Sequence, residues 1–217
     1  MSSKLPLIII AIFMCVSCMH APLPNLPDNW TGRIVPPEVL EDKPDMASLQ
    51  LFIMYGGLGC NHTASRYYCP GKGALFWDPG GNYGHHGFVK VTRKFNVVTQ
   101  NVPTANDYLH WRNLIPTMAT EMFVWEGNDR ILCELYDRIK TASTGAWVDG
   151  FTTASGGMFC SAATSSFLHR FAGDLFKVDK WGLPHNLSKQ IHLQGHPDRI
   201  YIIDHNKNTI RLYHPAP

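Results

Sequence analysis

The sequence predicts an α+β fold in which a short antiparallel sheet packs against about three helices. Short apolar runs bounded by glycine and proline turns are typical of strands and hairpins. Other stretches carry apolar residues every three or four positions, as amphipathic helices do. The chain has 217 residues, of which 45% are hydrophobic and 17% charged, enough apolar material for one core. We therefore expect a single globular domain over residues 47–217.

The first residues predict export. Lys4 supplies a basic start, and the apolar run 5–16 is too short for a membrane-spanning helix of about 20 residues. Its length is that of the apolar section of a secretion signal, which we place at residues 1–18. Ser17-Cys18 resembles a bacterial lipobox, in which Cys18 would carry a lipid and attach the protein to a membrane. The alternative is ordinary cleavage without a lipid.

The export signal implies a periplasmic protein, or an outer-membrane lipoprotein if Cys18 is lipidated. Residues 19–46 are rich in proline and predict a tether between the signal and the domain.

The domain begins with strand and hairpin patterns. The run LQLFIMY at 49–55 predicts a buried strand, which ends at two glycines. The segments 61–69 and 74–77 predict the arms of a hairpin around the Pro-Gly turn at 70–73. A glycine-rich loop follows at 78–84.

Helical patterns dominate the middle of the chain, and a hairpin ends it. The same criteria predict a strand at 86–91, a helix at 104–114 capped by Thr104, a strand at 121–125, helices at 128–140 and 159–170, and a hairpin at 199–213 with its turn at 204–208.

Four cysteines remain after the signal: Cys60, Cys69, Cys133 and Cys160. Four are too few for a disulfide framework in a chain of this length, although one bridge stays open in an oxidising compartment. If residues 60–69 form one strand, Cys60 and Cys69 lie about 30 Å apart at roughly 3.3 Å per residue. A disulfide needs about 5.5 Å between Cα atoms, so the strand interpretation excludes that pair.

Several functional classes have no support. The net charge is +2 without blocks of like charge, so we expect no nucleic-acid surface. The predicted domain contains neither HExxH nor CxxC spacing, and we therefore expect no metal and no cofactor. A GxSxG nucleophile motif is also missing, which argues against a serine hydrolase.

Cys160 is the candidate nucleophile. It follows Gly156-Gly157 and opens a predicted helix, where free amides and the helix dipole stabilise a thiolate. The glycines allow a sharp turn that leaves the sulfur accessible. The alternative is a buried structural cysteine, a common fate of free thiols.

His62 is the favoured base among eleven histidines because it begins a rigid hairpin arm. His85 and His86, in the glycine-rich stretch, are the alternatives. Folding about the Pro-Gly turn brings His62 opposite Asp78, which could accept the second ring N–H and fix the tautomer. Asp78-Pro-Gly is equally typical of a simple turn.

The order of these features carries a resemblance. A histidine at the head of a strand, an Asp-Pro-Gly-Gly loop, the strand EMFVW, an amphipathic helix and a glycine loop before Cys160 follow one another. This order resembles the circularly permuted papain-like cysteine hydrolases related to NlpC/P60 proteins, in which the histidine precedes the cysteine. The superfamily also holds lecithin:retinol acyltransferase-like enzymes and PPPDE-type isopeptidases. The resemblance covers residues 49–175 and implies a permuted papain-like fold.

The resemblance implies a thiol peptidase or amidase. Cys160 would be the nucleophile and His62 the base, with the third polar role at Asp78 or, failing that, at Asn82, His85 or His86. Phe159 replaces an asparagine found in some relatives, which leaves oxyanion stabilisation to backbone amides. The implied substrate is peptidoglycan stem peptide. A lipid-directed acyltransferase or esterase, a non-catalytic binding module and an antibacterial cell-wall toxin are the alternatives.

Overall fold

A nine-stranded antiparallel sheet runs through the part of the chain that the computed structural model describes, residues 31–55, 62–78, 91–92, 97–112, 119–144, 160–173, 178 and 184–214. In spatial order its strands are β1 (Thr31–Val35), β9 (Thr209–His214), β8 (Arg199–Asp204), β7 (Ala119–Glu126), β2 (Ser48–Tyr55), β3 (His62–Cys69), β4 (Gly73–Trp77), β6 (Val97–Val98) and β5 (Val91–Thr92). Every neighbouring pair is antiparallel. The predicted papain-like domain with a short sheet is therefore wrong, because one wide sheet is the framework of the whole domain.

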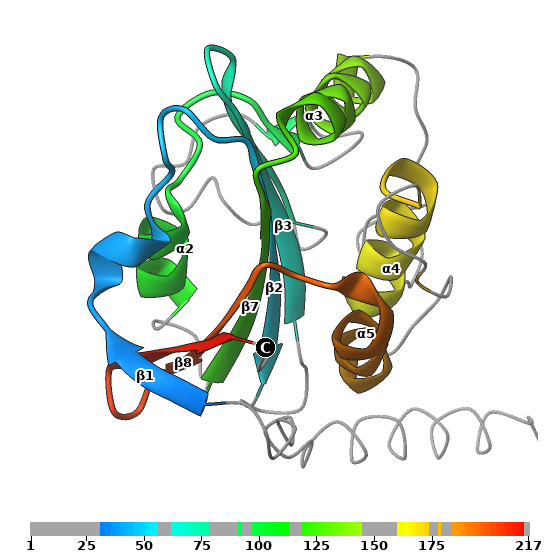
Figure 1. Cartoon of the computed structure of the whole chain (residues 1–217). Helices are drawn as coiled ribbons and strands as arrows, with labels where there is room; N and C mark the ends of the chain where they lie inside the picture. Colours follow the sequence, from blue (N-terminus) through cyan, green and yellow to red (C-terminus); the bar gives the residue numbers. More distant parts are fainter. Residues whose placement is uncertain are drawn as a thin grey trace, which may run out of the picture.

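Helices cover both faces of this sheet (Figure 1). The described residues form four α-helices, namely α2 (Ala105–Arg112), α3 (Asp129–Thr144), α4 (Cys160–Phe171) and α5 (Pro184–Gln190), together with the 3-10 turn η1 (Pro37–Leu40) and the π-helical turn η4 (Ile191–Gly195). We call the side covered by α3, α4 and α5 the α4 face, and the side covered by α2 and η1 the α2 face. The predicted count of about three helices was also too low.

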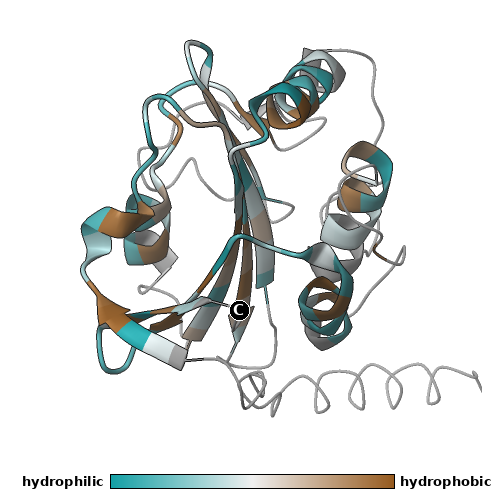
Figure 2. Cartoon of the chain, viewed as in Figure 1, coloured by the Kyte–Doolittle hydropathy of each residue, from teal (hydrophilic) through white to brown (hydrophobic). Residues whose placement is uncertain are grey.

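Strand β2 lies at the centre of the core, and all eight of its residues are buried. Leu51 and Ile53 point to the α4 face, whereas Phe52 and Met54 point to the α2 face. Because both sides are covered, residues 51–55 of the strand form a continuous apolar run. Figure 2 shows apolar residues concentrated on the central strands and on the side of α3 that is turned to them.

Most of the local predictions are confirmed. The predicted hairpin corresponds to β3 and β4, and its turn uses Gly71 and Gly73 at positive φ values of 74° and 86°. Thr104 caps α2: its Oγ1 accepts the Asp107 backbone N–H at 3.0 Å, and Asp107 Oδ2 accepts the Thr104 N–H at 3.3 Å. The predicted strand at 86–91 falls largely outside the described residues.

Strand β1 and helix α5 were not predicted. Strand β1 lies within residues 19–46, where we expected a tether, and it pairs with β9 along its whole length. Its short sequence TGRIV becomes a strand through this partner, which is almost 180 positions away in the sequence. Helix α5, with the sequence PHNLSKQ, has too few apolar residues to show a helical pattern.

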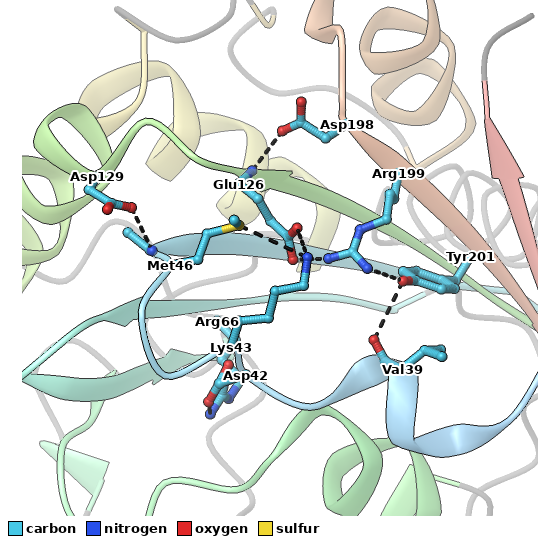
Figure 3. A network of polar contacts seen from close by, with 11 residues as sticks. Val39, Asp42, Lys43, Met46, Arg66, Glu126, Asp129, Asp198, Arg199 and Tyr201 are labelled. Atoms are coloured by element: carbon cyan, nitrogen blue, oxygen red, sulfur yellow. Dashed lines mark hydrogen bonds and ion pairs between the residues drawn. The ribbon is translucent and has the colours of Figure 1, made fainter.

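Charged side chains fix the segment between η1 and β2 to the sheet (Figure 3). Lys43 Nζ lies 2.9 Å from Glu126 Oε2, and the same carboxylate binds Arg199. Asp42 accepts two hydrogen bonds from Arg66, at 2.5 and 2.6 Å. The Arg66 side chain is almost fully buried, so this pairing also neutralises a charge in the core. This part of the predicted tether therefore packs on the domain.

A disulfide joins Cys69, at the end of β3, to Cys133 in α3, with their Cα atoms 5.3 Å apart. Two further contacts lie beside it. Lys72 Nζ is 2.6 Å from Asp137 Oδ2, and the Tyr136 hydroxyl donates to the Lys72 carbonyl at 3.0 Å. The bridge and these contacts together attach α3 to the β3–β4 turn.

Candidate active site

His62 and Asp78 form an imidazole–carboxylate pair at one end of the β3–β4 hairpin. His62 is the first residue of β3, and Asp78 directly follows β4. The hairpin register places Asp78 next to the beginning of β3. His62 Nε2 lies 2.8 Å from Asp78 Oδ2, and the two side chains are 14% and 2% exposed. The contact predicted between these residues from the sequence is present.

Tyr108 binds the same carboxylate oxygen. Its hydroxyl, on α2, donates to Asp78 Oδ2 at 2.7 Å. An ionised carboxylate only accepts hydrogen bonds, so Asp78 accepts from the His62 Nε2–H as well. The neutral imidazole then has Nδ1 as its unprotonated, basic nitrogen. A buried carboxylate beside the ring also favours the protonated imidazolium.

Helix α4 packs along β3 on the other face of the sheet. The Thr63 and Thr164 hydroxyls are hydrogen-bonded. One turn further along the helix, the Phe167 ring lies 6.2 Å from the Tyr67 ring and stacks on Trp77 at 4.3 Å. From the first contact to the second, the residue numbers increase in both β3 and α4, so the two elements run in the same direction. The N-terminal end of α4 therefore lies at the His62 end of the strand.

Cys160 is the first residue of α4, as the sequence predicted. It lies one helical turn, about 6 Å, before Thr164 on the same face of the helix. That position is at the positive end of the helix dipole. The Cys160 side chain is outside what the structure describes, so the pairing of its sulfur with His62 stays a prediction.

The sheet separates the two halves of the predicted site. His62 pairs with Met54 and shares its α2 face, whereas Thr63 and Thr164 meet on the α4 face. Since His62 begins the strand, its ring lies at the end of the sheet. An approach from Cys160 would have to come around this end.

The other candidates are distributed as follows. Asn82, His85 and His86, the alternatives to His62 and Asp78, lie outside the described residues, as does Cys60. Cys133 is bonded to Cys69 and is no thiol.

A buried polar network around Glu121 was not predicted. Glu121 is fully buried in β7, on the α4 face; Oε2 accepts from Tyr55 and Ser188, each at 2.7 Å, and Oε1 lies 2.5 Å from His192 Nε2. Burial, together with the Glu121 charge, raises the pKa of Tyr55, which therefore remains a donor. The sequence signal was a glutamate inside the apolar strand EMFVW. The network ties α5 and η4 to the sheet.

A separate pocket of about 150 Å³ lies between β1, α2 and the β8–β9 turn. Apolar side chains including Ile34, Leu109 and Ile210 line it, together with His110 and His205. His205 is hydrogen-bonded to Thr120 at 2.8 Å. Neither His62 nor Asp78 contributes to the walls of this pocket, which is small for a ligand site.

The residues that the structure describes contain neither a cluster of three or more metal-ligating side chains nor a helix long and apolar enough to cross a membrane. Comparison of the chain with protein families, curated proteins and solved structures finds no match.

Proposed function

We propose that this protein is an exported cysteine hydrolase that cleaves amide bonds, with Cys160 as nucleophile and His62, oriented by Asp78, as base. The observation that supports this most is the 2.8 Å contact between His62 and the buried Asp78 at the strand end beside the N-terminus of α4. A carboxylate that fixes the tautomer of a histidine is the arrangement that activates a nucleophile in hydrolytic triads.

The position of Cys160 supports the nucleophile role. Unpaired amides at the first turn of a helix stabilise negative charge, and this lowers the pKa of a thiol placed there. The same amides could bind the oxyanion that forms when a carbonyl is attacked. Both effects depend on the backbone of α4.

Export has two independent supports. One is the basic and apolar start of the sequence, which ends at Ser17-Cys18. The other is the Cys69–Cys133 disulfide, since such bridges persist in the periplasm and outside the cell and are rare in the cytosol. The expected N-terminus of the exported protein lies near Cys18, which mass spectrometry of protein from the producing cell can verify. An intact Met1 would contradict export.

The chemistry is acyl transfer to water. The Cys160 thiolate attacks the amide carbonyl, and the imidazolium of His62 gives its Nδ1 proton to the departing amine. A thioester remains on the cysteine. Water then attacks this thioester while Nδ1 accepts a proton, which releases the carboxylic acid and restores the thiolate and the imidazolium. Asp78 keeps its negative charge throughout and stabilises the imidazolium.

Peptidoglycan stem peptide is the first substrate to test, because export would place the enzyme near this amide-rich polymer. Purified peptidoglycan should release peptide fragments with the wild-type protein, and Cys160→Ser should lower the rate about a thousandfold or more. Cys60→Ser is the matched control and should retain the rate. Cleavage of lipid esters instead would change the substrate class, and inactivity on both substrates would favour a binding module.

A crosslink tests the geometry without a substrate. In a Cys60→Ser background, His62→Cys should form a disulfide with Cys160 on mild oxidation if their Cα atoms lie within about 7 Å. Peptide mapping identifies the product. If the two thiols stay unlinked while the Cys69–Cys133 bridge is intact, the Cα atoms of the two positions lie farther apart than about 7 Å, which argues against a direct contact between His62 and Cys160.

A further inference from the structure

Tyr108 holds the carboxylate on which the proposed base depends. We propose that Tyr108 is a positioning residue that fixes Asp78 and, through it, sets the basicity of His62. The proposal rests on the proposed function only for its effect on catalysis. The hydrogen bonds from Tyr108 and His62 to Asp78 are observed independently of that function.

The Tyr108 hydroxyl has little freedom to move. Its side chain is fully buried, and its ring packs 4.5 Å from Phe76 and 5.3 Å from Phe52. These two phenylalanines belong to β4 and β2, so they fix the ring against the α2 face of the sheet. The hydroxyl therefore meets Asp78 at a position that the core determines.

Strand β3 also fixes the helix that carries Tyr108. Arg66 lies on the same face of β3 as His62, and its Nε donates to the Pro103 carbonyl at 2.8 Å, just before α2. Thr104 then caps the helix. One strand thus positions both the imidazole and the helix that supports its partner carboxylate.

The two hydrogen bonds share one oxygen, Asp78 Oδ2. A hydroxyl that donates to a carboxylate stabilises its negative charge and weakens its attraction for a neighbouring proton. Tyr108 therefore lowers the affinity of His62 for its proton. Arg66 also lies on this face of β3, and its charge is paired with that of Asp42, which lies before β2.

The test is Tyr108→Phe, which removes only the hydroxyl. The His62 ring signal in an NMR titration, assigned by its disappearance in His62→Gln, should show a pKa about half a unit or more above that of the wild type. Tyr67→Phe is the matched control: it removes a buried hydroxyl on β3 that bonds to Ser65 at 2.8 Å, on the opposite face of the sheet. It should leave the titration of His62 unchanged.

Catalysis gives a second measurement. If the wild type cleaves an amide substrate, Tyr108→Phe should lower kcat about tenfold with little change in KM, and should move the alkaline limb of the pH profile of kcat/KM upward, because the imidazolium loses its proton at a higher pH. An unchanged His62 titration in Tyr108→Phe would overturn the proposal and leave Tyr108 a packing residue. If no substrate is cleaved but the titration moves as expected, the proposed function fails while the role of Tyr108 stands.

Discussion

Removal of the Cys69–Cys133 disulfide is the perturbation whose effect follows most directly from the structure. The bridge closes a loop of 64 positions. A crosslink reduces the entropy of the unfolded chain by about 2.1 + 1.5R ln n cal/mol/K, which for this loop is about 14 cal/mol/K, or about 4 kcal/mol at 25 °C. Domains are commonly stable by about 5–15 kcal/mol, so this is a large share of the total.

The measurement is urea unfolding of Cys69→Ala/Cys133→Ala beside the wild type. With a slope of about 2 kcal/mol/M, a loss of about 4 kcal/mol lowers the midpoint by about 2 M. Lys72→Ala is the control, because Lys72 and Asp137 join the same turn to α3 through an exposed ion pair. Lys72→Ala should lower the free energy of unfolding by less than about 1 kcal/mol.

Reduced wild-type protein should unfold like the double variant, because both lack the crosslink. If the double variant loses no more free energy of unfolding than Lys72→Ala does, the reasoning is refuted. It would mean that the bridge does not restrict the unfolded chain, and the disulfide would then no longer support an exported, oxidised protein.

Two further predictions concern buried polar groups. Glu121→Gln removes the charge that three donors bind, and should lower the free energy of unfolding by about 2–3 kcal/mol. Glu134 is exposed, and Glu134→Gln should change this free energy by less than about 0.5 kcal/mol. Equal effects of the two substitutions would contradict a stabilising network. Burial lowers the pKa of His205, so the unfolded chain binds its proton more tightly than the folded one. The free energy of unfolding should therefore fall as the pH drops below about 6.5, and it should fall less in His205→Gln. Urea unfolding at pH 7 and at pH 5 measures this change. An equal loss between the two pH values in wild type and variant would refute this origin.

Local patterns in the sequence predicted local structure well. The alternation and turn chemistry around residues 62–77 predicted a hairpin, and the contact between His62 and Asp78 followed from it. Thr104 and Asp107 identified a helix start that the structure confirms. In each case the interacting residues lie within about twenty positions of one another, so the relevant signal is local.

Interactions between distant segments were not predictable in the same way. Strand β1 exists because it pairs with β9 at the far end of the chain, and nothing in TGRIV indicates that partner. Tyr108 has no motif that relates it to Asp78, 30 positions earlier. The width of the sheet follows from such pairings between distant segments, which explains why the predicted sheet was too small.

The disulfide and the candidate site lie at opposite ends of β3. Cys69 ends this eight-residue strand and His62 begins it, so their Cα atoms are about 23 Å apart. The bridge attaches α3 to the hairpin turn, whereas the His62–Asp78 pair depends on the pairing of β3 with β4 and on Tyr108 of α2. The contacts described for the pair come from β3, β4 and α2. A reduced protein that remains folded therefore keeps its imidazole–carboxylate pair, and the redox state of the Cys69–Cys133 bridge acts on stability and not directly on this pair.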